Sequence, residues 1–388
     1  MFEIIKQDKE TRARVGLLQI NGRIVETPSY VVVGTKSEVK ALGPDDIAAT
    51  KTQMVIANTY HLWRKLKDGL NHFEGVHARI GWNGFMMTDS GGYQVFSLGA
   101  RREYKDGKVI VNEHEVIERV GDLGFTRVTE EGVCFFDDGE ECYLDAETSI
   151  AIQELLGADA IFVLDECTAR HHGWDYTKAS MRRTHRWAKR CLRAKTRSDQ
   201  MLYGIVQGGP FEDLRQESTK FIGSLPFDGV AIGGHLGTKQ KMQEVVDWCI
   251  PHLPREKPRH LLGIGAVDDL FNFVERGIDT FDCVIPTREA RHRAIWTPEG
   301  RINIRYERHI NDKSLLQDGC ECFACGKLGT TKAMLADCFH ANNKEGGYRA
   351  TLHNVYFFNN LMEQIRAFIK EDKFLEFKNQ FLANFQSR

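Results

Sequence analysis

The sequence predicts an α/β protein whose main domain is a (β/α)8 barrel. Eight short apolar runs, often β-branched, recur along the 388 residues, and most are followed by glycine or a small polar residue. Amphipathic segments of helical periodicity lie between several of them. Continuous apolar runs indicate strands that are buried on both faces, as in parallel sheets. Eight such strands alternating with helices favour the barrel, and a doubly wound sheet is the alternative.

The barrel strands are expected in eight runs of the chain, namely 29–35, 54–60, 85–90, 160–167, 202–209, 229–234, 260–265 and 281–286. Helical patterns cover 146–157 and 268–278, and each has a glycine near its end, as helix stop signals predict. A longer helical pattern covers 361–385 and can supply the last outer helix.

Two stretches interrupt the alternation of strands and helices. Residues 99–145 contain "KDGK" and "DDGE" turns between strand-like pieces, which predicts an antiparallel β insertion after the third strand. Residues 300–353 carry a cluster of cysteines. We therefore expect a barrel core over 1–299 that includes the insertion, a zinc-binding subdomain over 300–353, and a C-terminal helix over 354–388 that closes the barrel.

The composition bounds the kind of protein. With 42% apolar and 27% charged residues, the chain can bury a sizeable core. It has no apolar run of about 18 residues for a membrane span, and its N-terminus lacks the apolar segment of a secretory signal. We therefore expect a soluble, cytoplasmic protein. The formal net charge of −2 means that any basic footprint for a nucleic acid must be local. No P-loop motif is present, so direct ATP chemistry is not indicated.

Carboxylates, an amide and glycine pairs follow several of the predicted strands. They are Asp89 and Ser90, Asp165, Gln207, Gly233 and Gly234, and Asp282. The active site of a barrel lies at the carboxyl ends of its strands. Any one of these acids could be only a helix N-cap, but their convergence on one rim favours a site. An aspartate can accept two hydrogen bonds from a guanine-like N–H/NH2 edge, and paired carboxylates suit retaining glycosyl transfer.

A second cluster predicts a metal site. Cys320, Cys322 and Cys325 are closely spaced, and His353 follows downstream. Three thiolates and one imidazole form a closed tetrahedral set, the pattern of structural zinc. His340 is the alternative fourth ligand, and a group of ordinary buried thiols is the alternative to a metal. In a reducing compartment such a cluster favours a metal over disulfides.

Basic residues concentrate in two places. For residues 181–197 we favour the solvated face of a helix. The group at 288–293 directly follows the strand that carries Asp282, and it continues through Arg301, Arg305 and Arg308. Phosphates that bind to this second group would lie close to the chemistry.

In combination, several motifs resemble the tRNA-guanine transglycosylases, or queuine tRNA-ribosyltransferases, over nearly the whole chain. They are "NTYHL", "TDSGGYQVFSL", "TEEGV", "LGADAIFVLDECT", "GIVQGG", "VAIGG", "FDCVIPTR" and the Cys3His set, in the order of that family. The resemblance implies a pentosyltransferase of queuosine tRNA modification. It would exchange guanine at the anticodon wobble position of tRNA for queuine or its 7-aminomethyl precursor. The resemblance also implies double displacement through a covalent Asp–ribose intermediate, one structural Zn2+ and a homodimer.

The resemblance also implies roles for single residues. Asp282 would be the nucleophile and Asp89 the general acid/base. The residues expected to bind the base are Asp165, Gln207, Gly234, Tyr93, Ser90, Leu262 and Gly237. The residues expected to bind tRNA are Thr287, Arg288 and Arg291. The zinc ligands would be Cys320, Cys322, Cys325 and His353.

The chain departs from the family pattern after the sixth strand. It has Gly-Gly-His-Leu-Gly-Thr-Lys at 233–239, where bacterial members commonly have Gly-Gly-Leu-Ala-Val-Gly-Glu. Gly237 removes side-chain volume near the 7-substituent of the base, and Lys239 replaces a glutamate that helps to bind the cationic aminomethyl precursor. Our hypothesis is that the enzyme prefers queuine or another bulky base. An insertion at 101–122 is also unusual for the family, and the usual basic helix before His353 is missing.

Two other functions are open. A non-catalytic, tRNA-binding partner subunit would lack the nucleophile or the proton-transfer acid, yet Asp89 and Asp282 are both present. A related transglycosylase that acts on another tRNA position or on DNA is the second alternative.

Overall fold

The computed structural model of the chain describes most residues, which form two compact units. The described residues are 1–93, 95, 117–120, 124–137, 139–169, 172–234 and 237–385. Unit 1 consists of Met1–Ala57, Val76–Met86 and Pro258–Arg388, and unit 2 consists of Asn58–Gly75 and Met87–Lys257.

Eight parallel strands form a closed barrel, which confirms the predicted fold class. Their order is β11-β12-β13-β14-β15-β4-β5-β6. Because the sheet closes on itself, the doubly wound alternative is wrong. Each strand overlaps one of the eight apolar runs. The strands are β4 (Ser29–Val33), β5 (Met54–Ala57), β6 (Phe85–Thr88), β11 (Ala160–Phe162), β12 (Met201–Val206), β13 (Gly229–Ile232), β14 (Arg259–Leu261) and β15 (Thr280–Cys283).

The last barrel strand is shorter than the apolar run 281–286 predicts. β15 ends at Cys283, and the helix α10 (Ile285–Arg291) begins almost at once. Pro286 lies in the first turn of α10. Proline is well placed there, because the first N–H groups of a helix have no intrahelical partner and the φ of proline suits the helix. The expectation that the strand continues to Pro286 is therefore wrong, and the basic residues that follow belong to a helix.

Unit 1 carries most of the elements outside the barrel. An antiparallel sheet joins β1 (Phe2–Gln7), β2 (Arg14–Ile20) and β3 (Arg23–Thr27), and a hairpin joins β16 (Ala294–Thr297) to β17 (Gly300–Asn303). Its helices are α1 (Pro44–Ala49), α3 (Val76–Ile80), α9 (Val267–Glu275), α10, α11 (Lys332–His340), α12 (Lys344–Lys370) and α13 (Phe374–Asn384), with short turns at Glu307–His309 and Phe323–Lys327.

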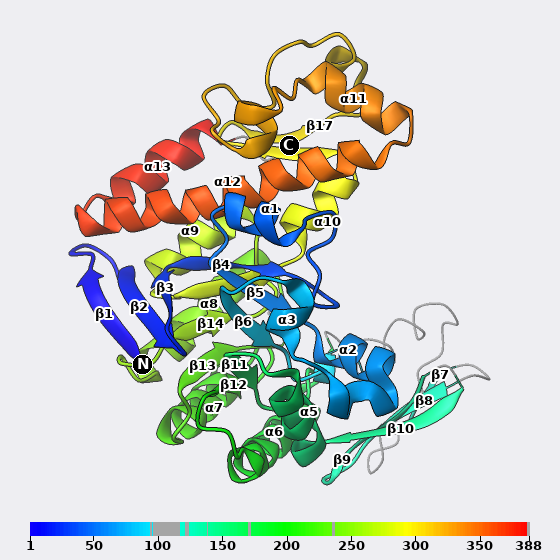
Figure 1. Ribbon diagram of the computed structural model, residues 1–388. Helices are drawn as coiled ribbons and strands as arrows, with labels where there is room; N and C mark the ends of the chain where they lie inside the picture. Colours follow the sequence, from blue (N-terminus) through cyan, green and yellow to red (C-terminus); the bar gives the residue numbers. More distant parts are fainter. Residues whose placement is uncertain are drawn as a thin grey trace. The chain divides into compact units, whose positions relative to one another are not determined.

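The end of the chain forms two helices, α12 and α13, which lie side by side in Figure 1. They are separated at Asp372, whose φ of 59° is not helical. Phe368 of α12 stacks on Phe377 of α13 with 4.3 Å between ring centroids. Phe271 of α9 packs against the same face of α13. The division of the chain at residues 299 and 353 stays a prediction.

Unit 2 contains the antiparallel insertion that follows β6. Its four strands have the order β10-β9-β8-β7. They are β7 (Ile117–Val120), β8 (Gly124–Val128), β9 (Gly132–Asp137) and β10 (Glu140–Asp145). Within the expected insertion, residues 99–116, 121–123 and 138 lie outside the described residues. They include all of the unusual stretch 101–122 except 117–120.

Each helix in the described part of unit 2 follows a barrel strand or the insertion along the chain. They are α2 (Thr59–Leu66), α5 (Ala146–Leu156), α6 (Trp174–Ala194), α7 (Glu212–Ser224) and α8 (Lys239–Cys249), with 3-10 turns at Lys67–His72 and Ile250–His252. The predicted helix at 146–157 is confirmed as α5. Asp145 caps its start, accepting from the Thr148 N–H at 2.7 Å, and Gly157 ends it in the left-handed conformation.

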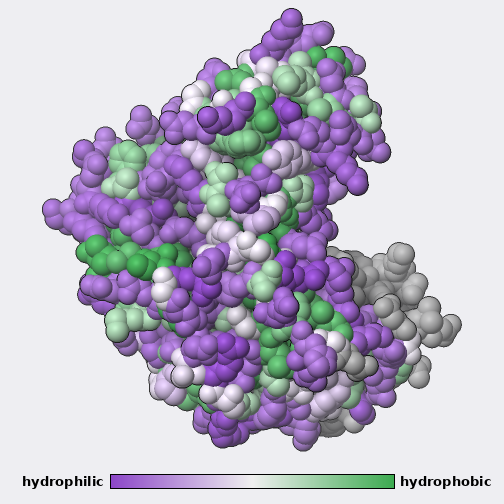
Figure 2. All heavy atoms as spheres, viewed as in Figure 1, coloured by the Kyte–Doolittle hydropathy of each residue, from purple (hydrophilic) through white to green (hydrophobic). Residues whose placement is uncertain are grey.

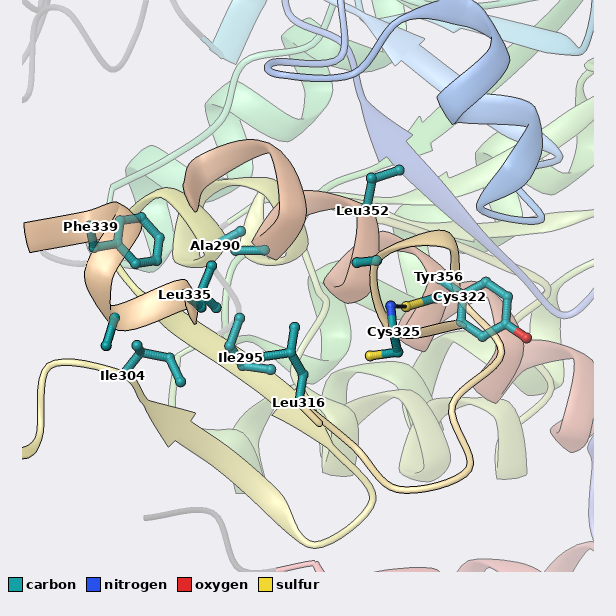
Figure 3. Packing of buried hydrophobic residues seen from close by; sticks show 13 residues of the cluster. Ala290, Ile295, Ile304, Leu316, Cys322, Cys325, Leu335, Phe339, Leu352 and Tyr356 are labelled. Atoms are coloured by element: carbon teal, nitrogen blue, oxygen red, sulfur yellow. Dashed lines mark hydrogen bonds between the residues drawn. The ribbon is translucent and has the colours of Figure 1, made fainter. Parts of the chain in front are cut away.

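The region around the cysteine cluster has a small core of its own, shown in Figure 3. Side chains from α10, β16, α11 and α12 converge there with two of the cysteines. The labelled members are Ala290, Ile295, Ile304, Leu316, Cys322, Cys325, Leu335, Phe339, Leu352 and Tyr356. Because this core is small, a bound metal ion would be expected to contribute much of its stability.

The face of the molecule in Figure 2 is mostly hydrophilic. None of the helices in the described part of the chain is both long enough and apolar enough to cross a membrane.

Candidate active site and metal centre

Asp89 directly follows β6 and is held by the residues at the end of β5. Its Oδ2 accepts from Asn58 Nδ2 at 2.5 Å. Its Oδ1 accepts from the backbone N–H groups of Thr59 at 3.0 Å and Gly91 at 3.1 Å. The side chain is half-buried. These contacts on both oxygens hold the carboxyl group in one orientation.

Asn58 has two functions in this arrangement. It is the N-cap of α2, where its Oδ1 accepts from the His61 N–H at 2.9 Å. This contact orients the amide so that Nδ2 points to Asp89. We did not single out Asn58 from the sequence, although it opens the "NTYHL" motif. The signal was an asparagine between a buried strand and a helical pattern, which indicates a cap.

Asp165 follows β11 and is buried against two residues predicted for the same site. Gln207 Nε2 donates to its Oδ2 at 2.6 Å, and the Ser90 hydroxyl donates to its Oδ1 at 3.4 Å. Burial raises the pKa of Asp165 to about 6, although the hydrogen bonds from Gln207 and Ser90 act in the opposite direction. The structure therefore brings together the residues at the ends of β11, β12 and β6 within unit 2.

Gly234 approaches the same cluster closely, in a backbone conformation that favours glycine. Its φ is +88°, and a Cβ there would lie 2.3 Å from Gln207 Oε1. Gln207 Oε1 is itself buried and, among the described residues, has no hydrogen-bond partner. A buried acceptor without a donor is costly, so this oxygen is a candidate contact for a ligand N–H.

Arg215 of α7 binds the loops that follow β12 and β13. This residue was not identified from the sequence. Its guanidinium is fully buried and donates to three backbone carbonyls. Nε donates to Gly209 O at 2.7 Å, while Nη1 donates to Val206 O at 3.1 Å and to Gly233 O at 2.9 Å. The same side chain thus ties the loop after β12 to the loop after β13.

Two other predicted base-binding residues of unit 2 lie at the surface or in a turn. Tyr93 is 63% exposed, so its ring is available for stacking. Gly237 has a φ of +83° and lies just before Thr238, the N-cap of α8. A glycine at 237 thus has a backbone reason as well as the loss of side-chain volume that the sequence suggested. His235 and Leu236 lie outside the described residues.

Asp282 lies on β15 in unit 1, with its side chain 17% exposed. Its Oδ1 accepts from the Gly263 N–H at 2.9 Å and lies 3.1 Å from His260 Nε2. His260 is on the neighbouring strand β14 and is fully buried. The sequence analysis missed His260, for which the only signal was a histidine inside an apolar run. The half-buried Leu262 follows on the same segment.

The predicted tRNA-binding residues lie on α10, directly after Asp282 in the chain. Arg288 is exposed. Arg291 is half-buried and donates from Nη1 to Thr287 O at 2.7 Å, while Thr287 itself is buried. Burial lowers the pKa of Arg291, with a further contribution from the positive charge of Arg288. Arg293 contacts Phe339, which assigns it a packing role.

Most of the other basic stretch, 181–197, belongs to α6, which ends at Ala194, and several of its arginines pair with acids of unit 2. Arg186 binds Glu130 at 2.6 Å and Arg182 binds Glu217 at 3.2 Å. Arg190 pairs with Glu147. These arginines therefore form a solvated, ion-paired face of α6, which fits the interpretation that the sequence favoured.

The four predicted metal ligands come together as one group in unit 1. Their ligand atoms all lie within 4.8 Å of one another. His353 Nδ1 is 3.7, 3.5 and 3.5 Å from the sulfurs of Cys320, Cys322 and Cys325. Tetrahedral zinc with usual bond lengths would place sulfur and nitrogen roughly 3.5 Å apart, so the donor set fits. His340 is exposed at the end of α11 and is not in the group.

The tautomer of His353 also suits metal binding. Its Nε2 lies 2.9 Å from the carbonyl oxygen of Trp296. A carbonyl can only accept, so Nε2 carries the proton and the lone pair of Nδ1 faces the sulfurs. Such an outer contact is usual for histidine ligands and orients the ring.

The sequence profile described as "Queuine tRNA-ribosyltransferase" matches residues 8–387. The chain belongs to this family. A queuine tRNA-ribosyltransferase from Halothermothrix orenii is 39% identical over an alignment of 390 residues, covering 100% of this chain and 98% of that protein. Proteins of the same name from Pelotomaculum thermopropionicum and Bacillus subtilis are 40% and 37% identical. Each covers 99% of this chain, and this chain covers 98% and 96% of them.

The queuine tRNA-ribosyltransferase family is one of pentosyltransferases, so the chain is an enzyme of that class. The family motifs contain the residues that make the contacts around Asp89, Asp165 and Asp282. "NTYHL" and "TDSGG" supply the Asn58–Asp89 contact, and "LDEC" and "GIVQGG" supply the Asp165–Gln207 contact. "FDCVIPTR" supplies Asp282 and the start of α10.

Proposed function

We propose that this chain is a tRNA-guanine transglycosylase. It exchanges guanine at the anticodon wobble position of tRNA for a 7-deazaguanine base, as a step of queuosine modification. Family membership supports ribosyl transfer on tRNA. The single observation that carries the choice of base is the buried contact between Asp165 and Gln207, beside Gly234.

These three residues present the groups that a guanine-like edge requires. An ionised Asp165 can accept from the ring N–H and the exocyclic NH2. Gln207 Oε1, which lacks a donor in the described part of the chain, can accept a further N–H. The Gly234 N–H would be offered to the exocyclic oxygen, and the missing side chain lets the base approach the backbone. Ser90 orients Asp165, and Tyr93 and Leu262 would contact the faces of the base.

Asp282 and Asp89 would carry the chemistry. Asp282 attacks ribose C1′ and forms a covalent tRNA–enzyme intermediate while guanine departs with a proton supplied by Asp89. The incoming base then loses a proton to Asp89 and displaces Asp282. Two inversions at C1′ retain the configuration, and because one N-glycosidic bond replaces another, no energy-coupling step is needed. Thr287, Arg288 and Arg291 would bind the neighbouring phosphates.

The Cys3His group would hold one structural Zn2+. Zinc accepts thiolate and imidazole ligands in a tetrahedral arrangement, and four protein ligands leave no open position for water or substrate. The ion would therefore stabilise the fold around α12 and take no part in the reaction. We further propose a homodimer with a cytoplasmic location, where its tRNA substrate is found.

For the incoming base, we propose a preference for queuine over its aminomethyl precursor. Lys239 begins α8 and would repel the cationic aminomethyl group, and Gly237 leaves space for a larger substituent. Competition between the two bases for incorporation into tRNA tests this preference. Clear preference of the wild type for the aminomethyl base would contradict it, and Lys239→Glu should move the preference toward that base.

The central test is an exchange assay with labelled guanine and tRNA. The wild type should exchange the label and form an adduct with tRNA that survives SDS. Asp282→Asn should form no adduct while still binding tRNA. A normal adduct with the asparagine variant would refute the nucleophile assignment. Exchange on a DNA substrate, with none on tRNA, would favour the alternative polymer.

A further inference from the structure

Three side chains of unit 1 form a continuous hydrogen-bonded chain that ends at the nucleophile. Thr280 Oγ1 lies 2.9 Å from His260 Nδ1, and His260 Nε2 lies 3.1 Å from Asp282 Oδ1. Thr280 and Asp282 are two residues apart on β15, so their side chains point to the same face of the strand. His260 pairs with Thr280 in the parallel register of β14 and β15. Thr280 and His260 are fully buried.

The chemistry of Asp282 and Thr280, the two partners of His260, determines the tautomer of its imidazole. An ionised carboxylate can only accept, so Nε2 carries the proton and donates to Asp282. In the tautomer with its single proton on Nε2, Nδ1 is an acceptor, and the hydroxyl of Thr280 is the donor that faces it. Thr280 therefore favours the one tautomer that can donate to the nucleophile.

All of these contacts fall on one oxygen of Asp282. Oδ1 receives the His260 N–H and also the Gly263 N–H at 2.9 Å. Within the described ranges of the chain, Oδ2 receives no hydrogen bond. Gly263 is exposed and has a φ of +74°, a conformation that glycine adopts without strain. The carboxylate is thus oriented by one oxygen while the other is free to react.

We propose that His260, with its tautomer set by Thr280, is a positioning residue for Asp282. It holds Oδ1 so that Oδ2 is the attacking atom, and it stabilises the negative charge when Asp282 departs again. This inference rests on the proposed function, because it requires Asp282 to be the nucleophile.

Both half-reactions use this arrangement. In the first, a lone pair of Oδ2 forms the bond to C1′, and the electrons of the C1′–N bond leave with guanine, which takes up a proton. Oδ1 then becomes the carbonyl oxygen of an ester and keeps its two donors. In the second, the nitrogen of the incoming base loses its proton and bonds to C1′, and the electrons of the Oδ2–C1′ bond return to the carboxylate. Fixed donors are most useful at this point, because they need no reorganisation as the charge returns.

Substitutions along the chain of contacts test the proposal by single-turnover formation and breakdown of the tRNA adduct. His260→Phe removes the donor and should slow both steps roughly 100-fold, the size typical for one donor to a developing charge. Thr280→Val keeps the shape of residue 280 and should slow them by about 10-fold, because the favoured tautomer is lost. His260→Gln can place an N–H near the position of Nε2 and should recover much of the rate. The affinity for tRNA should stay unchanged in all three.

Thr297→Val is the matched control. It removes another fully buried hydroxyl of unit 1, one that donates to Gly300 O within the β16–β17 hairpin, and should leave the rates unchanged. Wild-type rates in both His260→Phe and Thr280→Val would overturn the proposal. So would equal losses in His260→Phe and His260→Gln when both are folded by circular dichroism. If the wild type formed no adduct at all, the proposed function would fail instead, so the two failures are distinguishable.

Discussion

Gln207 donates a 2.6 Å hydrogen bond to Asp165, and this contact fixes a carboxylate that burial alone would disfavour. The amide holds one carboxylate oxygen by its NH2 group and leaves its own Oε1 beside Gly234. A preformed pair of this kind needs little rearrangement when a flat, hydrogen-bonding base enters.

The first prediction concerns Asp165, whose pKa of about 6 lies above the ordinary value of 3.8 because of burial. A raised pKa in the folded state means that this group's contribution to stability is lost as pH rises through about 6. Asp165→Asn should therefore increase the unfolding free energy at pH 7.5 by up to roughly 3 kcal/mol, with a higher melting temperature, and the gain should shrink at pH 4.5. The KM for guanine should rise sharply. An unchanged KM would exclude Asp165 from base binding.

The same titration predicts a pH dependence of the wild type. Below about pH 6, Asp165 becomes protonated and loses acceptor capacity for the edge of the base. The KM for guanine should thus increase as pH falls through this range, while the affinity for tRNA changes less. Base titrations at several pH values measure the effect, and a KM that is flat between pH 5 and 8 would contradict it.

Asn58 allows the contact with Asp89 to be separated from helix capping. Asn58→Asp keeps a good N-cap for α2 but replaces the donor by a like charge. Repulsion should raise the pKa of one of the two carboxyls and shift the acidic limb of the exchange rate to higher pH. The control is Asn58→Ser, which also caps the helix but adds no charge. Stability should be similar in the two variants, whereas the shift of the pH profile should occur only in Asn58→Asp.

The two histidines that the sequence offered as the fourth ligand give a direct test of the metal centre. His353→Ala should lower the bound zinc well below one equivalent per chain and reduce the melting temperature, because Nδ1 completes the donor set. His340→Ala should retain the metal, since this side chain is exposed and lies outside the group. Elemental analysis and thermal unfolding measure both. A folded protein that is free of metal would contradict the site.

Arg288, the exposed arginine of α10, should contribute more to tRNA binding than the ion-paired arginines of α6. Arg288→Gln should weaken tRNA binding and reduce the slope of log K against log salt by about one unit, as expected for the loss of one phosphate contact. Arg186→Gln is the control, because Arg186 is already paired with Glu130. Equal losses in the two variants would indicate a diffuse basic surface instead of a contact at α10.

The sequence alone was sufficient to locate the strands of the barrel, although not the end of β15, and to propose the residues of the site. The segments 54–57 and 229–232 carry no polar side chain because their strands, β5 and β13, are buried along their whole length. The spacing of Cys320, Cys322 and Cys325 predicted a metal site because ligands that close together serve few other purposes. Family motifs then supplied the proposed roles of Asp89 and Asp282.

Only the tertiary structure decided which residues support those groups. His260 and Asp282 are 22 positions apart, and they meet because β14 and β15 are neighbours in one register. His353 rather than His340 completes the cysteine group because α12 carries it inward, whereas α11 leaves His340 exposed. The sequence could not show that Arg186 and Arg190 of α6 form ion pairs, because their partners, Glu130 and Glu147, come from distant segments of the chain. Hydrophobic periodicity is a local property of the chain, but hydrogen bonds and charges are paired through space, so the sequence determined the scaffold and the fold determined the partners.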